Sequence, residues 1–369
     1  MIDILGYRRS DGSLGIRNHV AVIYTVECAK VVAARIAAQF PNTQLFGRRT
    51  GCFYSGPIRD KLVALGRHPN VASALVVGLG CEYIDAAEVA EAIGETGKPT
   101  ASLIITRSGG TLRSLEQGCK LLDGLVQAAY TAPRALLAVA DLVVAMDCAG
   151  SDATSGLASN PAVGAAADLL VDAGATVYFF NIWKELIGVG DILAKRAVNA
   201  EIAAKLRAVC PDEGDPDVNW GNMQGGITTY REKAAGALAK GGTRPIQGVI
   251  DSFRRPERHG LYLQIPVPDS SEGESDPQCA MQMAAAGAHI VVETTGVGTV
   301  TGGVVAPVIK VCANPQTIAL LGDDMDIDAS PILLGEKTVA EVGQEIYAEI
   351  LAVAAGKRTR PEMLGHFED

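Results

Sequence analysis

The sequence is poor in aromatic residues and has no long apolar run. Aromatic side chains make up 5% of its 369 residues, and only two of them are tryptophans. No window reaches the roughly 18 consecutive apolar residues that a membrane-spanning helix needs. The first residues also lack the apolar core of a signal peptide. We therefore expect a soluble, cytoplasmic protein rather than a membrane-bound or secreted one.

An excess of basic residues is also missing. Lysine and arginine number 32 against 42 aspartates and glutamates, so the formal net charge is −10. Because nucleic-acid binding needs a basic surface, we expect no nucleic-acid partner. A small anionic substrate stays compatible with this charge, since a locally positive site can lie on an acidic protein.

Apolar segments of strand length alternate with helix-like segments along the chain. The length suits two domains, and the many small residues suit closely packed α/β layers. Repeated strand-then-helix order predicts an α/β fold with mostly parallel, open sheets and an active cleft at the C-terminal edges of the strands. The strand-like segments include 20–25, 74–80, 101–106, 142–147 and 176–181.

A polar stretch that contains proline and glycine, residues 210–226, interrupts this rhythm. Its composition is typical of a loop, and we place the domain boundary there. The sequence thus predicts an N-terminal α/β domain over residues 1–215 that carries a cysteine cluster. A C-terminal α/β domain over residues 216–369 is expected to complete the cleft.

The eight cysteines include no Cys-x-x-Cys pair, and structural disulfides are not expected in a reducing compartment. Four of them, Cys28, Cys52, Cys81 and Cys148, come just after predicted strands. If those strands are parallel and share a sheet, the thiols gather along its C-terminal edge. Ordinary buried packing is the alternative for each thiol alone. As a set, with glycine and carboxylate neighbours, they favour a role as ligands of iron, an iron–sulfur cluster or zinc.

Other motifs carry weaker signals. The segment TTGVGTVTGG (294–303) could cradle a phosphate, but it does not have the G-x-G-x-x-G spacing of a dinucleotide site. Close packing of a glycine-rich loop is the alternative. The five histidines show no metal-like pairing, and no G-x-S-x-G nucleophile elbow occurs.

Several motifs occur in an order that resembles a known family. They are GYRRSDGSLGIRNHVAVIYTVEC, VVGLGCE, MDCAGSDATSGLASNPAVG, GNMQGGITT and TTGVGTVTGG. Together they resemble the altronate/galactarate dehydratase family of hydro-lyases, and also the large subunit of sulfolactate sulfo-lyase. The resemblance implies an iron-dependent lyase, with Fe²⁺ or an iron–sulfur cluster. Its reaction would be a β-elimination that converts a 2-hydroxy acid into a 2-oxo acid.

The resemblance also implies the residues of the site. Elimination needs an acid on the leaving group and a base for the proton beside the carboxylate. The resemblance assigns iron binding to Cys28, Cys52, Cys81 and Cys148. It assigns catalytic roles to Glu82 and Asp152, and we expect one for Arg48, which stands in place of a family histidine near Cys52. It assigns substrate binding to Ser151, Ser155, Asn160, Asn222, Thr295 and Lys310. The run VVGLGCE would be a strand that delivers a thiol and a carboxylate to this site, with two glycines for close backbone approach.

This chain departs from the family pattern where polar groups are expected. Arg48 replaces a histidine, Asn181 and Lys184 replace glutamates, and Met223 and Val297 replace a lysine and an arginine. A less polar lining disfavours a polyhydroxy acid, because buried hydroxyls would stay unpaired. We therefore predict dehydration of a small anionic 2-hydroxy acid.

Two alternatives to this reaction stay open. One is a sulfo-lyase large subunit that releases sulfite from a sulfolactate-like acid. The other is a catalytically altered family member that serves as a binding or assembly subunit.

The resemblance also bears on partners. Family dehydratases usually carry an additional small SAF-like domain at the N-terminus, which in the sulfo-lyase is a separate small subunit. This chain begins directly at the GYRR motif. We expect a separate small SAF-like subunit as a partner, and a homo-oligomer.

Overall fold

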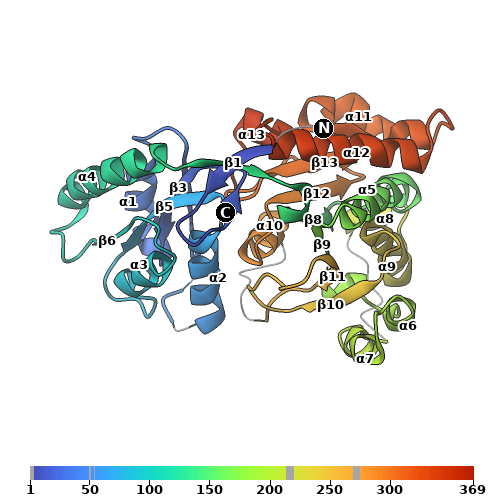
Figure 1. The fold of residues 1–369 in the computed structure, drawn as a ribbon, viewed down its shortest axis with the longest axis horizontal. Coiled ribbons are helices and arrows are strands. Elements are labelled where there is room, and N and C mark those ends of the chain that lie inside the picture. The colour runs from blue at the N-terminus through green and yellow to red at the C-terminus, as the bar shows by residue number, and fades with distance from the viewer. Residues whose placement is uncertain (1–3, 50, 54, 213–219, 269–274) are drawn as a thin grey trace.

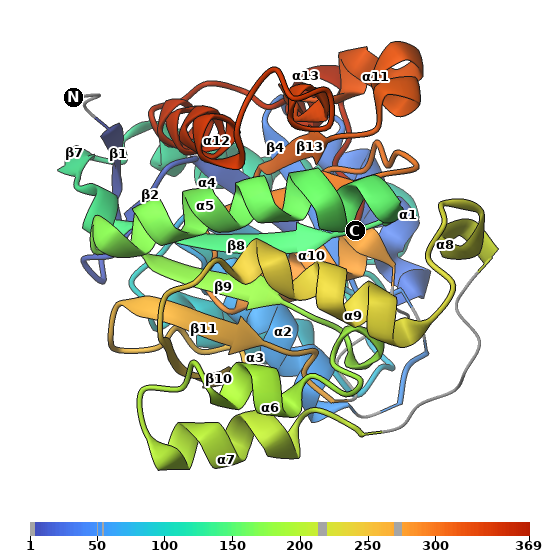
Figure 2. The same cartoon turned by 90° about the vertical axis from the view of Figure 1, so that its right-hand side faces the viewer.

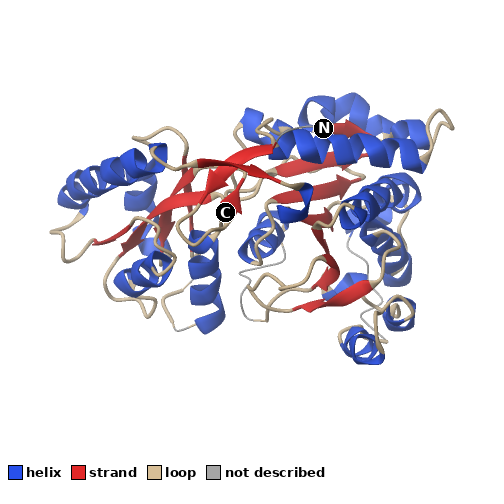
Figure 3. Cartoon of the chain, viewed as in Figure 1, coloured by secondary structure: helices blue, strands red, loops and turns tan. Residues whose placement is uncertain are grey.

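The computed structural model describes residues 4–49, 51–53, 55–212, 220–268 and 275–369. Two parallel sheets lie next to each other, and a small antiparallel sheet runs between them (Figure 1). Helices lie outside the strands of both parallel sheets (Figure 3). The predicted α/β class with mostly parallel sheets is confirmed.

The first parallel sheet has four strands in the order β4-β3-β5-β6. Its strand β5 is buried at every residue, as expected where helices cover both faces. Helices α1 and α4 pack on one face, and α2 and α3 pack on the other. The strands are β3 (His19–Tyr24), β4 (Thr43–Gly47), β5 (Val71–Gly78) and β6 (Thr100–Ile104), and the helices are α1 (Glu27–Ala37), α2 (Gly56–Arg67), α3 (Ala86–Gly94) and α4 (Thr111–Tyr130).

The second parallel sheet has seven strands in the order β10-β11-β9-β8-β12-β13-β14. Helices α5 and α12 cover one face, and α10 lies on the other face, where it packs against α2 of the first unit. A continuous apolar core therefore joins the two sheets. The strands are β8 (Val143–Cys148), β9 (Thr176–Phe180), β10 (Ile246–Ile250), β11 (Gly260–Gln264), β12 (Ile290–Thr295), β13 (Val308–Cys312) and β14 (Ile327–Asp328).

Most helices of the second unit pack around the edges and faces of this sheet (Figure 2). None of the helices within the described ranges is long and apolar enough to cross a membrane. These helices are α5 (Asn160–Asp172), α6 (Gly190–Ala194), α7 (Ala200–Ala208), α8 (Trp220–Gln224), α9 (Tyr230–Leu238), α10 (Asp276–Ala285), α11 (Pro315–Leu321), α12 (Val339–Ala354) and α13 (Arg360–Leu364).

The small antiparallel sheet connects the two units. It has three strands in the order β2-β1-β7, which are β2 (Leu14–Gly15), β1 (Ile4–Arg8) and β7 (Arg134–Leu137). Because β7 follows the last helix of the first unit and precedes the second sheet, the chain passes between the units at this point.

The structure corrects the predicted domain boundary. Residue 215 itself lies outside the described residues, but strands on both sides of it belong to one sheet. Strand β9 pairs with β11, and β8 pairs with β12, across the polar 210–226 loop. The division between the two parallel sheets therefore falls near β7, and the 210–226 segment is a loop within the second unit.

Candidate active site

The carboxylate of Glu82 is bound by its own loop. It accepts a hydrogen bond from Thr25 Oγ1 (2.6 Å) and from three consecutive backbone amides, those of Leu79 (2.9 Å), Gly80 (2.7 Å) and Cys81 (2.9 Å). Burial alone raises the pKa of Glu82, but these hydrogen bonds outweigh it and lower the pKa below its ordinary value. The carboxylate expected to act in catalysis therefore stabilises the turn after β5.

Two glycines make this turn possible. A Cβ atom on Gly78 would lie 2.6 Å from Glu82 Oε1, so a larger residue would displace the carboxylate. Gly80 has a φ of +112°, and a Cβ there would lie 2.4 Å from Thr106 Oγ1. The close backbone approach predicted for this run is present. It serves the loop itself rather than a ligand.

The four cysteines expected to share a site divide between the two sheets. Cys28, Cys52 and Cys81 are exposed and follow strands of the first sheet. The amide of Tyr83 donates to the carbonyl of Cys52 (3.1 Å), so the last two of these loops lie side by side. Cys148 differs, because it is buried and ends β8 of the second sheet.

An iron site shared by these four thiols does not fit this arrangement. Within the described ranges, no group of three or more His, Cys, Asp and Glu side chains could hold a metal ion. Cys148 lies instead 3.0 Å from the ammonium of Lys240, a positive charge that disfavours a metal cation at the sulfur. Iron dependence stays a prediction.

A cavity of about 230 Å³ lies at the C-terminal ends of β8, β9 and β12. This is the edge at which open α/β sheets bind ligands, as the sequence predicted for the cleft. The lining contains charges of both signs and two thiols, beside the apolar Ile182 and Val297. Its polar side chains are Asp147, Cys148, Lys184, Glu185, Asn222, Lys233, Asp276 and Cys279.

Four buried groups form a compact cluster against this cavity. Lys240 Nζ lies 3.0 Å from Cys148 Sγ and 3.4 Å from Glu185 Oε2. The other carboxylate oxygen, Glu185 Oε1, lies 3.5 Å from Cys148 Sγ and 3.9 Å from Lys233 Nζ. The side chains of Lys240 and Glu185 are only 0% and 4% exposed. We call Cys148, Glu185, Lys233 and Lys240 the lysine–glutamate cluster.

The electrostatics of the cluster separate charged from neutral groups. Burial, with Glu185 as the next cause, raises the pKa of the Cys148 thiol to about 12, so the thiol is neutral at pH 7. Burial by itself lowers the pKa of Lys240, but the neighbouring Cys148, Glu185 and Asp147 outweigh burial and raise the pKa, so the ammonium stays charged. Burial also raises the pKa of Asp147 well above its usual range, opposed by Lys240. Burial therefore favours the protonated form of the Asp147 carboxyl, which lines the cavity.

Local sequence explains how helix α9 and the turn after it position the two lysines. Thr229 and Glu232 form a capping box that fixes the start of α9, and Lys233 follows directly. After α9, a Cβ on Gly241 would lie 2.8 Å from the ring of Phe179 in β9. This close packing holds Lys240, the residue before that glycine, against the end of the sheet.

The sequence did not single out Asp147, Glu185, Lys233 or Lys240 as site residues. Asp147 carried a usable signal, because it ends an apolar strand beside Cys148. The two lysines carried none, since a lysine in a short helix is usually on the surface. Only the packing of α9 on the sheet reveals their burial.

Four predicted residues line a neighbouring groove of about 490 Å³ along α9. They are Ser151, Asp152, Ser155 and Asn160. Asp152 is engaged by its surroundings, since it accepts hydrogen bonds from Ser155 N (3.1 Å) and from Asn314 Nδ2 (2.8 Å). Lys233 lines both this groove and the cavity, so the two spaces are neighbours.

The remaining predicted substrate contacts have mixed outcomes. Asn222 lines the cavity, donates to the carbonyl of Ser151 (2.7 Å) and accepts from Lys233 Nζ (3.1 Å). Thr295 Oγ1 accepts from the amide of Gly298 (3.1 Å) and so shapes the loop after β12.

Two further predicted residues serve the structure instead. Lys310 is buried in an ion pair with Glu293, their side chains being 0% and 2% exposed, and it is not part of the cavity lining. The predicted contact between Lys310 and the substrate is thus not supported by its position. Arg48 is buried in the first unit and donates from Nη1 to the carbonyl of Phe53 (2.6 Å). It stabilises the loop that carries Cys52.

Two family models together match nearly the whole chain. The model described as D-galactarate dehydratase/altronate hydrolase, second domain, matches residues 6–130. The model described as D-galactarate/altronate dehydratase, C-terminal, matches residues 139–369. The chain belongs to the D-galactarate/altronate dehydratase family. The gap between the two models coincides with β7, where the two parallel sheets divide.

Curated relatives agree with this family. The chain is 32% identical to (2R)-sulfolactate sulfo-lyase subunit beta from Chromohalobacter salexigens, over 99% of this chain and 95% of the relative. It is 31% identical to galactarate dehydratase (L-threo-forming) from Escherichia coli, over 96% of this chain and 73% of that enzyme. It is 30% identical to altronate dehydratase from Bacillus subtilis, over 97% and 75%. The predicted family is confirmed, and with it the enzyme class, a hydro-lyase.

Two departures from the family pattern lie directly in the cavity. Lys184 and Val297 are both lining residues, and Val297 is 45% exposed. Asn181 is buried behind them, and its Nδ2 donates to the carbonyl of Glu185 (3.3 Å). Met223 is exposed on α8, next to Asn222. Two of the substitutions therefore line the cavity beside the lysine–glutamate cluster, whereas Arg48 lies in the first unit.

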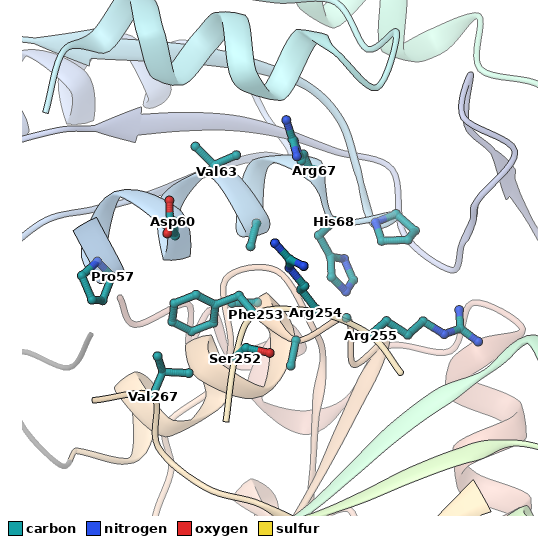
Figure 4. Close-up of a pocket in the computed structure, with 15 residues that line it drawn as sticks. Pro57, Asp60, Val63, Arg67, His68, Ser252, Phe253, Arg254, Arg255 and Val267 are labelled. Carbon is teal, nitrogen blue, oxygen red and sulfur yellow. The ribbon is translucent and has the colours of Figure 1, made fainter. Parts of the chain in front are cut away.

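A larger cavity of about 680 Å³ lies between α2 and the loop after β10 (Figure 4). Its central polar groups already have partners. His68 contacts the carbonyl of Ala288 through Nε2 (3.0 Å) and accepts from the amide of Asn70 at Nδ1 (3.0 Å). Arg67 donates to the carbonyl of Ala92 (2.9 Å). This cavity marks the seam between the two units and holds no acid–base cluster like that at β8.

Proposed function

We propose that the protein is a lyase that performs β-elimination on a short, anionic 2-hydroxy acid and yields a 2-oxo acid. The observation that carries the proposal is the lysine–glutamate cluster, buried against a cavity at the C-terminal edge of the second sheet. Charged groups are costly to bury without a function or a partner. Here three ionisable groups and a thiol converge beside a cavity at the edge where open α/β sheets bind ligands.

Glu185 is the group best placed to act as the base. Its carboxylate lines the cavity, and its oxygens lie 3.4 Å from Lys240 Nζ and 3.9 Å from Lys233 Nζ. In the proposed step it removes the proton from C2, next to the substrate carboxylate. The electron pair of the C2–H bond then forms the C2–C3 double bond, and the leaving group departs from C3 with its bonding pair.

Asp147 is suited to assist the leaving group. Its carboxyl lines the same cavity and accepts a hydrogen bond from the amide of Cys148 (2.8 Å), and burial raises its pKa, which favours the proton-carrying form. When the leaving group is hydroxide, this carboxyl supplies the proton that makes it water. The enol product then tautomerises to the 2-oxo acid.

Lysines would hold the acid end of the substrate. Lys184 and Lys233 both line the cavity, and an ammonium group pairs well with a carboxylate or sulfonate. Val297 replaces a family arginine and adds an apolar side chain to the lining. The cavity of about 230 Å³ is also smaller than the roughly 300–1,000 Å³ of sites for drug-sized ligands. Size and lining both favour a three- or four-carbon acid over a hexarate.

A sulfolactate-like acid is the second candidate substrate. The relative from Chromohalobacter salexigens matches this chain over 95% of its own length, whereas the dehydratases match over about three quarters of theirs. Its name gives it as a beta subunit, so we propose a separate small partner subunit for this chain as well. Sulfite needs no proton to leave, and Asp147 would then be dispensable for that step.

Whether turnover requires iron is a separate question that has to be measured. The exposed thiols of the first sheet and Cys148 of the second sheet do not form one ligand set. Anaerobic reconstitution with iron and sulfide, followed by iron analysis, measures the requirement directly. Bound iron that increases turnover supports the family-type cofactor, and full turnover at negligible iron content contradicts it.

A substrate panel tests the proposed function. Purified protein would be assayed with three-, four- and six-carbon 2-hydroxy acids and with sulfolactate, with and without iron and any small partner subunit. Release of 2-oxo acid and of sulfite would be followed separately. Turnover of the short acids supports the proposal. Efficient turnover of galactarate or altronate, with none of the shorter acids, contradicts the size and lining argument.

A further inference from the structure

The last described residues of the chain cross from the second sheet to the first. Glu368 accepts a hydrogen bond through Oε2 from the amide of Gly302 (2.9 Å), in the glycine-rich loop after β12. The next residue, Asp369, contacts side chains at the C-terminal edge of the first sheet. Figure 1 places this end of the chain between the two units.

Three donors converge on Asp369. The hydroxyl of Tyr24 donates to Oδ2. Lys30 Nζ lies 3.6 Å from Oδ1, and Arg49 Nη1 donates to the backbone oxygen of the same residue (3.0 Å). Lys30 also lies over the ring of Tyr24, 5.4 Å from its centroid. A hydroxyl, an ammonium and a guanidinium are together a typical set for holding a carboxylate.

These donors stand where the fold would bind a ligand. Tyr24 is the last residue of β3, Lys30 lies early in α1, and Arg49 comes just after β4. Ligands of open parallel sheets bind at this edge. Tyr24 is fully buried, so its ring is fixed and its hydroxyl is held in place for an acceptor.

Asp369 is held in a way that permits displacement. The side chains of Lys30 and Asp369 are 32% and 16% exposed, and partly solvated ion pairs contribute little to stability. The anchor of the tail lies upstream, since Phe367 packs on the apolar core between the sheets. Asp369 can therefore leave the three donors while the tail stays attached. A tethered group of this kind acts as a competitor at high effective concentration.

We propose that Tyr24, Lys30 and Arg49 form an anion-binding site for a carboxylate or sulfonate group, in which the side chain of Asp369 is a built-in competitor. The site lies on the first sheet, apart from the cavity at β8, and does not depend on the proposed reaction. A small anionic acid that enters this site would displace Asp369. It would also release the contacts of Asp369 with the first sheet.

Binding of methanesulfonate tests the proposal without any turnover. Isothermal titration calorimetry would compare the full chain with its Asp369→Asn variant, which keeps the shape of the side chain and removes its charge. Loss of a tethered competitor should tighten binding about tenfold or more. Asp323→Asn removes one exposed negative charge elsewhere and should leave affinity within about twofold. Equal affinity of the wild type and Asp369→Asn would overturn the proposal.

A second pair of variants locates the bound anion. In the Asp369→Asn background, Lys30→Met should abolish the gain in affinity. Lys120→Met removes a 72% exposed lysine that pairs with Glu116 of its own helix, and should preserve the gain. Tight binding that survives Lys30→Met would place the anion elsewhere and overturn the assignment. Melting temperatures of all variants report whether each one folds.

Discussion

Replacing Lys240 with methionine removes the central cation of the lysine–glutamate cluster. Lys240 is fully buried, 3.4 Å from Glu185 Oε2, and Glu185 is only 4% exposed. Removing one partner of a buried pair typically costs about 3–5 kcal/mol, because the other charge stays buried. Lys233 remains 3.9 Å from the other oxygen of Glu185 and compensates in part. We therefore expect Lys240→Met to lower the free energy of unfolding by about 3 kcal/mol.

A matched control isolates the effect of burial. Lys205 pairs with Glu201 at 3.0 Å, but these side chains are 59% and 71% exposed. Lys205→Met should cost no more than about 1 kcal/mol. Urea denaturation followed by circular dichroism gives both values, provided that the slope of the transition stays constant. Adding Glu185→Gln to Lys240→Met should recover part of the loss. Equal destabilisation by Lys240→Met and Lys205→Met would refute the reasoning.

Three further predictions concern the first sheet. Gly78→Ala should destabilise the protein by about 1–3 kcal/mol, because the added Cβ would lie 2.6 Å from Glu82 Oε1. Gly124→Ala is the control: its Cβ would meet nothing within 4 Å, so it should stabilise the protein by up to about 1 kcal/mol. Thermal unfolding compares the two variants. Wild type should have a higher free energy of unfolding than Glu82→Gln above pH 4.5, the ordinary pKa of the group. This difference should disappear as the pH falls through the lowered pKa that Glu82 has in the folded protein. Denaturation at several pH values measures it. Anaerobic iron uptake, if the exposed thiols support it, should decrease in Cys81→Ala; unchanged uptake would remove Cys81 from the ligand set.

The sequence predicted the layers of the fold but not their grouping. Strand-then-helix order was enough for two parallel sheets, because buried strands are recognisable as apolar runs. The boundary was misplaced because a polar loop at 210–226 resembles a linker. Pairing of β9 with β11 across that loop is a long-range contact, and local composition carries no information about it.

The candidate site shows the same limit. The sequence identified Cys148 and Asn222, which line the cavity, since motifs mark them. It could not place three strand-end thiols on one sheet and the fourth on another, because strand ends alone do not say which strands share a sheet. Lys240 was missed because its burial depends on the packing of α9 and the following glycines. Glu82 was assigned to catalysis because hydrogen bonds from its own turn are invisible in a motif.

The most direct test of the central claim is the kcat/KM of Glu185→Gln on a short 2-hydroxy acid that the wild type converts. Loss of a general base should lower kcat/KM about 10²–10⁴-fold while the fold is retained. Glu201→Gln, in the exposed pair on α7, should leave kcat/KM unchanged. A folded Glu185→Gln variant with wild-type kcat/KM would contradict the account, because the elimination would then not depend on the lysine–glutamate cluster.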